Sequence, residues 1–250
     1  HTLGRAQGLM ADASRDIRLG RLWGLSDDAL SLVVPGSGGI HLDEVTSGSS
    51  DLSNAVLEAD IPDGVPLIIN PRGFRPGSVR NDTFFQAIPG VLARFPDALF
   101  LCPTMAGQVE ALAWIKRLGV AANVRLLPHL PQADLWELFR RAKVSVSPSI
   151  HDGTPNSMLE AMACGCFPIA GDIESVREWI TPGVNGLLVD PGSAGGLSTA
   201  IIAALSNSQL LENAAAYNAT LIAKRADHRQ VFQNIDAFYQ AVLVRETNSG

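Results

Sequence analysis

Residues 144–170, VSVSPSIHDGTPNSMLEAMACGCFPIA, decide the fold because they read as strand, helix and strand in close succession. Val144–Val146 and Phe167–Ala170 are short aliphatic runs of the kind that form buried parallel strands. Met158–Ala163 between them carries apolar residues at helical spacing. The segment therefore predicts a strand, a short crossover helix and a second, parallel strand.

The residues at the two ends of this short helix are typical of helix boundaries. Thr154 is a good N-cap, Pro155 suits the first helical position, and Gly165 lies where a left-handed cap is wanted. The amino end of the helix would lie at the edge of the sheet that is formed by the carboxyl ends of the strands. Free amides there, those of Asn156 and Ser157, together with the helix dipole can hold an anion, and a phosphate is the natural guest.

The same alternation of strand and helix continues in both directions, which predicts an α/β fold with a parallel sheet and helices on both faces. Ligands of such sheets bind beyond the carboxyl ends of the strands. The further expected strands are Val65–Ile69, Ala98–Cys102, Val124–Leu127 and Gly186–Val189. The further expected helices are Thr83–Arg94, Gln108–Leu118, Ala133–Arg141 and Ile173–Ile180, followed by Ala194–Leu205, Gln209–Lys224 and Arg229–Val244.

The amino-terminal part has a different pattern. Residues 3–22 read as one helix, and Leu30–Val34 reads as a strand that ends in Pro35 and a glycine-rich hinge at 36–39. The stretch from His41 to Gly64 is rich in acids and serines, as linkers are. We expect four parts: residues 1–40, a linker at 41–64, a ligand-binding domain at 65–228 and a carboxy-terminal helix at 229–250.

Composition excludes several classes of protein. The chain has 250 residues, 46% of them hydrophobic, and a net charge of −6, so a globally basic surface for nucleic acid is ruled out. Three cysteines and no signal-peptide pattern favour the cytoplasm, with association at the inner face of the membrane left open. The sequence contains no phosphate loop, no nucleophile-elbow serine and no pair of aspartates separated by one residue to hold a divalent metal, so no metal is expected.

Charged residues gather at the ends of two expected strands. Asp152 would lie in the loop at the amino end of the short helix, and Glu160 would lie along its side. Either acid alone is more commonly a turn or surface residue. Arg72, Arg75 and Arg80 follow the strand that ends at Ile69. An arginine about 4 Å from a phosphate charge gains about 4 kcal/mol at an effective dielectric constant near 20, before desolvation is subtracted.

These residues carry a resemblance to a known family. Ser149–Gly165, with Pro168–Ala170 and Asn185–Val189 after it, resembles the donor-binding domain of retaining family 4 glycosyltransferases, the glycosyl transferases group 1, of the GT-B fold. The similarity runs from about Pro66 to Leu205 and includes Glu178 five residues before Gly183. It implies a Rossmann-like domain that forms the carboxy-terminal half of a GT-B enzyme.

The resemblance also implies roles for individual residues. Arg72 and Arg80 would hold the diphosphate and stabilise it as it leaves, with Arg75 a rival for the second position. Asp152, where the family commonly has Glu, would contact the transferred sugar, and Glu160 would bind the ribose hydroxyls. The diphosphate would also meet the amides of the helix start, and His129 would lie at the nucleobase pocket. The residues of the helix start are Gly153, Thr154, Pro155, Asn156 and Ser157.

The predicted function is transfer of a sugar from a nucleoside diphosphate sugar to an acceptor with retention of configuration. The nucleotide sugar is the substrate, and no cofactor is expected. The acceptor, a glycan, lipid or small molecule, would need a first domain of which 1–40 is the tail, so we expect these 250 residues to bind without turnover. An epimerase or phosphorylase of similar fold, or a non-catalytic nucleotide-binding domain, remains an alternative.

Overall fold

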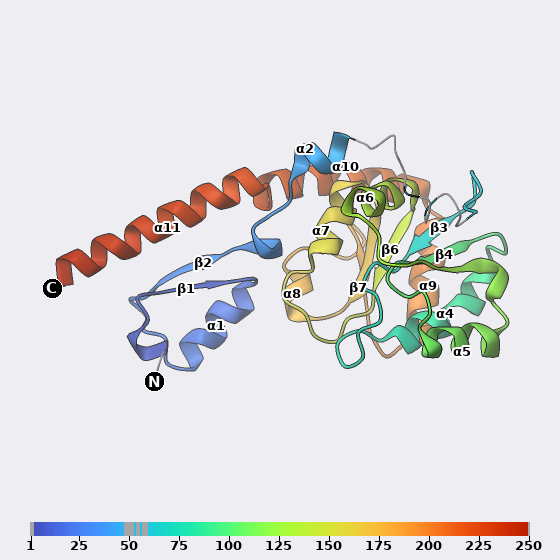
Figure 1. The fold of residues 1–250 in the computed structure, drawn as a ribbon, viewed down its shortest axis with the longest axis horizontal. Coiled ribbons are helices and arrows are strands. Elements are labelled where there is room, and N and C mark those ends of the chain that lie inside the picture. The colour runs from blue at the N-terminus through green and yellow to red at the C-terminus, as the bar shows by residue number, and fades with distance from the viewer. Residues whose placement is uncertain (1–2, 48–52, 54–55, 57–59, 250) are drawn as a thin grey trace.

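The computed structural model describes residues 3–47, 53, 56 and 60–249, and its larger body is a sheet of six parallel strands (Figure 1). The strands lie in the order β5-β4-β3-β6-β7-β8. Their bounds are β3 Leu67–Ile69, β4 Leu99–Cys102, β5 Val124–Leu126, β6 Val144–Ser147, β7 Phe167–Gly171 and β8 Leu187–Val189. The order of the sheet reverses between β3 and β6, which is where doubly wound folds bind their ligands. The expected fold class is confirmed.

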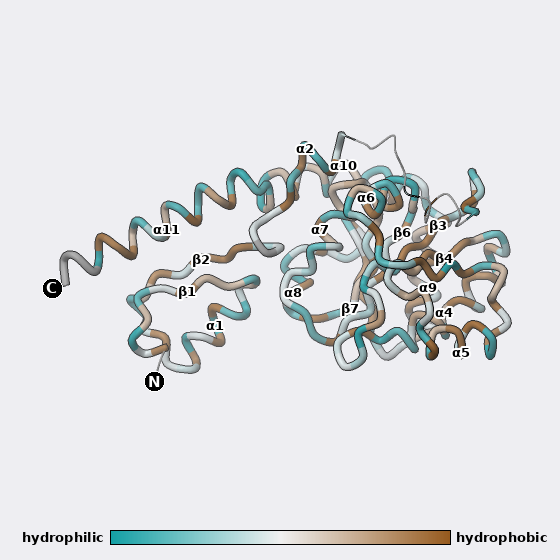
Figure 2. Tube along the Cα trace, viewed as in Figure 1, coloured by the Kyte–Doolittle hydropathy of each residue, from teal (hydrophilic) through white to brown (hydrophobic). Residues whose placement is uncertain are grey.

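Helices cover both faces of this sheet. One face carries α4 Asn81–Leu92, α5 Val109–Leu118 and α9 Ala194–Leu205. The other carries α6 Gln132–Arg141 and α7 Asn156–Ala163, while α10 Ser208–Arg225 packs on both, through Ala214 on the first face and Ile222 on the second. Side chains that alternate along the strands supply both layers: Ile68 packs under the first set, while Leu67 and Ile69 pack under the second. Figure 2 shows the hydrophobic character of β3 and β4 within this core.

The first residues of the described chain form a small separate unit, and the expectation of one helix over residues 3–22 is wrong. A 3₁₀ turn, η1 Leu3–Arg5, is followed by β1 Gly8–Ala11 and then α1 Ser14–Leu22. β1 pairs in parallel with β2 Leu30–Val33. The apolar run of β1 can be read as helix or as buried strand, and only the pairing with β2 decides between them.

The last helix, α11 His228–Ser249, leaves the larger body and lies along the small unit (Figure 1). A Cβ atom on Gly8 would come within 2.6 Å of the Phe238 ring, so the helix packs directly on β1. The described residues of 1–40 and 229–250, which the sequence suggested as two separate parts, thus contribute to one unit. Among the described residues, no helix is both long enough and apolar enough to cross a membrane.

Two chain segments connect the small unit to the larger body, and they run side by side. The amide of Ile40 donates to Ala226 O over 2.6 Å, and His228 donates back to Ile40 O over 3.0 Å. Gly39 has a φ of 92°, and a Cβ there would meet Ala226 O at 2.8 Å, so only glycine fits this crossing. The turn before it, η2 Pro35–Ser37, changes the chain direction as the glycine-rich sequence suggested.

The expected linker and one expected helix differ from what the structure shows. Residues 42–47 of the expected linker form α2 Leu42–Ser47, and Asp51 and Glu58 of that linker lie outside the described residues. The helix expected at Ile173–Ile180 is the single turn α8 Glu174–Arg177. After Arg177 the chain continues as a turn, in which the amides of Trp179 and Ile180 donate to Val176 O over 3.0 and 3.1 Å, and both side chains are buried.

Candidate active site

Arg72 and Asp152 meet at the point where the order of the sheet reverses. Arg72 lies in the loop after β3, and Asp152 lies in the loop after the neighbouring strand β6. The Nη2 atom of Arg72 donates to Asp152 Oδ2, and its Nη1 donates to Ser157 Oγ over 3.3 Å. One guanidinium therefore joins the acid of the β6 loop to the first turn of α7, as the sequence predicted for Arg72 and that helix end.

Arg72 is held in a partly dry environment. Its side chain is 9% exposed, and its Nε–H has no hydrogen-bond partner among the described residues. Burial lowers the pKa of Arg72, and the negative charge of Asp152 opposes that shift. A buried donor without a partner costs free energy unless a ligand accepts from it, so the site favours an anionic guest.

A cavity of about 320 Å³ opens on the other side of Arg72. Arg75 and His129 lie in its wall, and none of the described lining residues is acidic. Thr104 in the same wall has a φ of 62°, which is strained for a β-branched residue and is found most often at functional sites. The cavity combines positive charge with the apolar surfaces of Phe74, Leu130 and Leu135. This combination suits a nucleoside that carries phosphates.

The structure separates Arg80 from this group. Arg80 precedes α4 and makes two contacts of 2.8 Å with the carboxylate of Asp82, and its side chain is 40% exposed. The interaction with Asp82 raises the pKa of Arg80. Arg75, which the sequence left as a rival, lines the cavity beside Arg72 instead. The loop of residues 71–80 is long enough to carry its two outer arginines to different places, which sequence spacing alone does not show.

Glu160 lies one helical turn beyond Ser157 on α7. Burial raises its pKa to about 7, and the nearby polar groups of Gln132 and Trp136 oppose the shift. Gln132 also lines the cavity, so Glu160 stands behind the wall that holds His129. This position is compatible with the role that the family resemblance implies for Glu160.

The start of α7 differs from the prediction by one residue. The helix begins at Asn156, its N-cap is Pro155, and Thr154 does not cap it. The Thr154 hydroxyl instead donates to Asp12 O in the small unit over 2.7 Å. The correction has a physical reason: Thr154 is buried between the two units, and the carbonyl of Asp12 satisfies its hydroxyl. At the other end Gly165 has a φ of 81°, as expected of a left-handed cap.

Buried amides, to which the sequence analysis gave no role, hold the Arg72 loop in place. Asn70 is completely buried, and its Oδ1 accepts from the Arg72 amide over 3.2 Å. Asn81 accepts from the Asn70 side chain over 3.4 Å and donates to Gly73 O over 3.3 Å. Asn70 follows β3 directly, which was a usable signal. Asn81 could be connected to it only in three dimensions.

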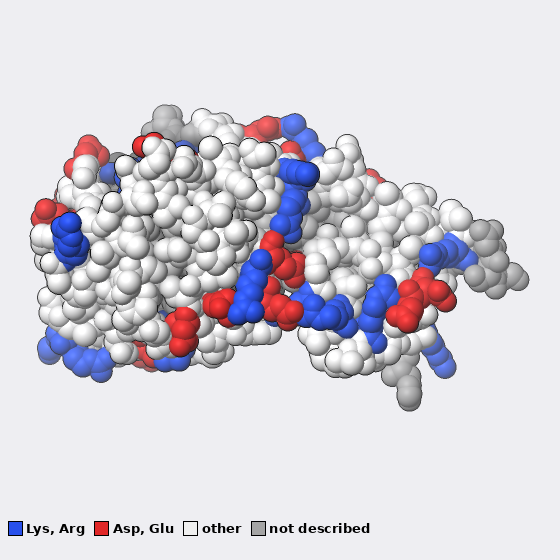
Figure 3. Space-filling model, turned by 180° about the vertical axis from the view of Figure 1, so that it is seen from behind, with Lys and Arg blue, Asp and Glu red and all other residues white. Residues whose placement is uncertain are grey.

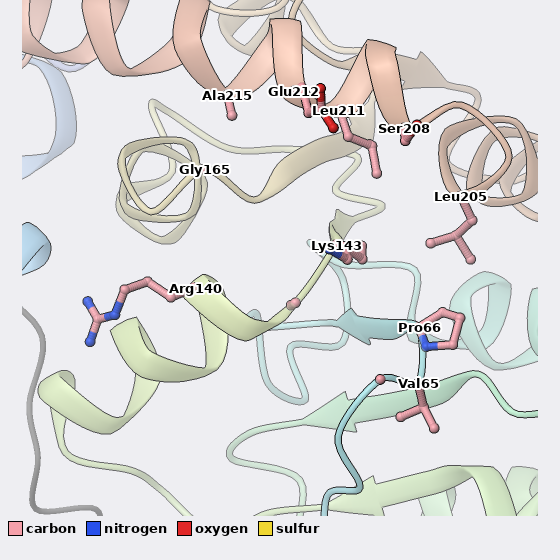
Figure 4. Close-up of a pocket in the computed structure, with 12 residues that line it drawn as sticks. Val65, Pro66, Arg140, Lys143, Gly165, Leu205, Ser208, Leu211, Glu212 and Ala215 are labelled. Carbon is pink, nitrogen blue, oxygen red and sulfur yellow. The ribbon is translucent and has the colours of Figure 1, made fainter.

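A second cavity, of about 340 Å³, lies at the opposite edge of the sheet (Figure 4). Its lining includes Pro66, Lys143 and Gly165, which come just before β3, β6 and β7. It therefore opens at the amino ends of the strands. Ligands of doubly wound sheets bind at the other edge, so the cavity beside Arg72 is the candidate site.

Comparison with known proteins agrees with this placement. Residues 82–221, more than half of the chain, match the family model described as Glycosyl transferases group 1. The chain belongs to this family. The resemblance stated from the sequence is thereby confirmed. The matched range of the group 1 glycosyltransferase chain includes Asp152, Glu160 and α7, and it begins just after Arg80.

Individual relatives share parts of the chain. A D-inositol 3-phosphate glycosyltransferase of Geodermatophilus obscurus is 36% identical over 104 residues, which cover 42% of this chain and 23% of that protein. A phosphatidyl-myo-inositol mannosyltransferase of Mycolicibacterium smegmatis is 31% identical over 168 residues, which cover 66% and 40%. The group 1 glycosyltransferase chain thus spans less than half the length of these two relatives.

Solved structures share its fold across almost the whole chain. Sucrose-phosphate synthase of Thermosynechococcus elongatus has a TM-score of 0.79 at 18% identity, covering 97% of this chain and 60% of that one. The Anabaena protein HepE, solved with UDP-glucose, has a TM-score of 0.77 at 19% identity, covering 95% and 65%. The chain therefore shares the fold of these proteins over the part of them that it covers.

Proposed function

We propose that this chain is the donor-binding part of a retaining glycosyltransferase and that it binds a nucleoside diphosphate sugar between Arg72 and the amino end of α7. The contact of one buried guanidinium with both Asp152 and Ser157 carries this proposal. A diphosphate placed there would accept from the unpartnered Nε–H of Arg72 and from the free amides of the helix start.

The neighbouring residues would divide the rest of the donor between them. The cavity beyond Arg72 would hold the nucleoside, with His129 in its wall and Glu160 behind Gln132 to accept from the ribose hydroxyls. Asp152 would face the sugar. This arrangement extends the nucleotide along the sheet edge from β5 toward β6. The resemblance to structures such as that of HepE with UDP-glucose supports this use of the fold.

In the proposed reaction the bond between the anomeric carbon and the diphosphate breaks, and the acceptor oxygen bonds to that carbon. The proton of the acceptor hydroxyl passes to the departing phosphate, which leaves as the nucleoside diphosphate. Arg72 and the dipole of α7 stabilise the charge that develops on the leaving group. Retention of configuration is the course that the family resemblance implies, and the anomeric configuration of the product tests it.

Nucleotide binding to this chain tests the proposal. Titration calorimetry without added metal should detect binding of UDP, GDP or ADP and of the corresponding nucleotide sugars. Arg72→Ala should lower the affinity for the nucleotide about 10- to 100-fold, because a charge-assisted hydrogen bond is lost. Arg72→Lys keeps the positive charge but loses the forked geometry of the guanidinium. Its nucleotide affinity should lie between those of the wild type and Arg72→Ala, with the fold intact.

Arg75 and Arg80 provide a matched pair for the second basic position. Arg75→Ala should weaken nucleotide binding several-fold because Arg75 lines the cavity, whereas Arg80→Ala should leave it within about twofold. A loss at Arg80 equal to that at Arg72 would restore Arg80 to the site. If no nucleotide binds to the folded wild-type chain, the donor-site proposal is wrong. Turnover of a nucleotide sugar without any acceptor would instead support an epimerase.

A further inference from the structure

Charged and polar contacts join the small unit to the larger body close to the candidate site. Figure 3 shows acidic and basic side chains gathered along the junction between the two. The contacts come from the first turn of α1 on one side and from the short helix α8 and the residue after it on the other.

Glu178, which directly follows α8, is the central residue of this junction. Its two carboxylate oxygens accept from the backbone amides of Ser14 over 3.1 Å and Arg15 over 3.2 Å. These amides belong to the first turn of α1, where the N-cap residue Ala13 offers no side-chain acceptor. A helix start with unsatisfied amides and a positive dipole end favours a carboxylate, so Glu178 caps α1 from the other unit.

The same turn of α1 touches the candidate site. Arg15 Nη1 donates to the carbonyl oxygen of Asp152 over 3.2 Å, and the Thr154 hydroxyl donates to Asp12 O. A Cβ atom on Gly153 would lie 2.6 Å from Asp12 Oδ2, so the small unit also packs against the backbone between these two contacts. The backbone of residues 152–154 is therefore held by the small unit together with Ser175 of α8, whose hydroxyl donates to Asp152 O over 2.8 Å, while the Asp152 carboxylate faces Arg72.

Glu178 is itself anchored near the crossing of the two connecting segments. Its carbonyl oxygen accepts from Arg225 Nη1 over 2.7 Å, and the Arg225 guanidinium lies 4.1 Å from the Trp179 ring centre. Arg225 ends α10, and Ala226 and His228 at the crossing follow at once. Glu178 thus links the crossing, the start of α1 and the loop that carries Asp152.

We propose that Glu178 is a positioning residue that latches α1 over the donor site and fixes the Asp152 segment beside Arg72. The latch itself is independent of the ligand. Its consequence for sugar transfer rests on the function proposed above. Without the Glu178 carboxylate, two amides of α1 lose their acceptor, and the small unit separates more readily from the site.

A distance measurement in the full 250-residue chain tests the latch. Spin labels at Leu22→Cys on α1 and Val109→Cys on α5 occupy exposed positions, whereas the native cysteines are buried or half-buried. In the wild-type chain we expect one narrow distance distribution. Glu178→Ala should lower the ratio of closed to open molecules about tenfold and broaden that distribution. Glu178→Gln keeps one good acceptor and should give an intermediate result.

Glu174→Gln is the matched control. Glu174 lies on α8 and pairs with Arg18 of α1, but both side chains are more than half exposed, so its loss should leave the distances unchanged. An unchanged distribution in Glu178→Ala, or equal broadening in Glu174→Gln, would overturn the proposal. Equal melting of the six-stranded sheet in all variants, followed by circular dichroism, excludes general unfolding as the cause.

Activity separates positioning from donor binding. Nucleotide affinity of Glu178→Ala should stay within about twofold of wild type, because Glu178 has no place in the proposed diphosphate site. In any form of the protein that transfers sugar, the same variant should lower kcat while the donor KM stays nearly constant. If the distances change but no nucleotide binds to any variant, the latch stands and the proposed function fails. If nucleotide binds and the distances do not change, the proposed function stands and the proposed role of Glu178 fails.

Discussion

Glu160 shows how burial sets the properties of one residue in the candidate site. Its pKa of about 7 lies above the value of 4.5 expected for an exposed glutamate, because desolvation disfavours the charged form. The folded state therefore binds a proton more tightly than the unfolded state does. Between pH 4.5 and 7 the free energy of unfolding falls as pH rises, and above pH 7 the penalty is complete.

Glu160→Gln should therefore change stability and binding in opposite directions. Above pH 7 the variant should gain on the order of 2 kcal/mol in free energy of unfolding, and the gain should vanish below pH 4.5. Nucleotide affinity should fall about tenfold, because the variant lacks the carboxylate that we propose accepts from the ribose hydroxyls. Urea unfolding at pH 4.5 and 8 and calorimetry at pH 8 measure the two effects. Exposed Glu212→Gln is the control, and a pH-independent gain would contradict the assignment.

The loop after β3 shows how an element positions a functional side chain. Arg72 reaches α7 because its amide is fixed by Asn70, and Asn70 is fixed by Asn81 at the start of α4. The two buried side-chain amides form hydrogen bonds to each other and to the loop backbone, which satisfies polar groups that water cannot reach. The orientation of Arg72 is thus a property of the β3–α4 connection as a whole, and α4 extends it into the core through Phe84 and Ile88.

Asn81→Ala should disturb this loop indirectly, because Asn81 contacts Asn70 and Gly73 and has no place among the proposed ligand contacts. We expect a loss of about 1 to 3 kcal/mol in free energy of unfolding, since Asn70 and Gly73 O lose a buried partner. Nucleotide binding should weaken as well, because Arg72 is no longer held toward α7. Asn123→Ala removes two amide hydrogen bonds of 2.9 and 3.0 Å elsewhere in the fold and should lower stability alone. Equal binding losses in both variants would argue against a specific role for Asn81.

The whole molecule is organised around the crossing at Ile40 and His228. On one side lies the six-stranded sheet with its site, and on the other lie β1, β2 and α1 with α11 beside them (Figure 1). A two-stranded sheet has too little core to persist alone, so α11 supplies the apolar surface that the small unit needs. The position of Asp12 and Arg15 at the site depends on that packing.

Phe238→Ala should loosen the small unit while sparing the larger body. Phe238 contacts β1 at Gly8, and its removal leaves a space that the two-stranded sheet cannot fill. Hydrogen exchange at the amides of β1 and β2 should become faster by about tenfold or more, while the six-stranded sheet keeps its protection. Leu243→Ala, at an exposed position of the same helix, is the control. Equal acceleration in both sheets would show that the two parts unfold together.

The sequence by itself determined the layers of the larger body and pointed to the sheet edge where the candidate site lies. Hydrophobic periodicity and turn residues predicted all six strands of its sheet, because short aliphatic runs that alternate with helical patterns are typical of strands buried on both faces of a parallel sheet. The same local signals indicated α7, its glycine cap and the nearby residues Arg72, Asp152 and Glu160. Each of these signals lies within one supersecondary unit, where sequence neighbours are also neighbours in space.

Only the tertiary structure decided which of these residues meet. Arg75 rather than Arg80 lies at the cavity, Thr154 bonds to Asp12 rather than capping α7, and Glu178 caps a helix 163 residues away. Residues 8–11 likewise form the strand β1 because β2 pairs with them and α11 packs on them. These outcomes depend on partners far along the chain, and neither local propensity nor hydrophobic spacing carries information about which distant backbone group satisfies a buried polar atom.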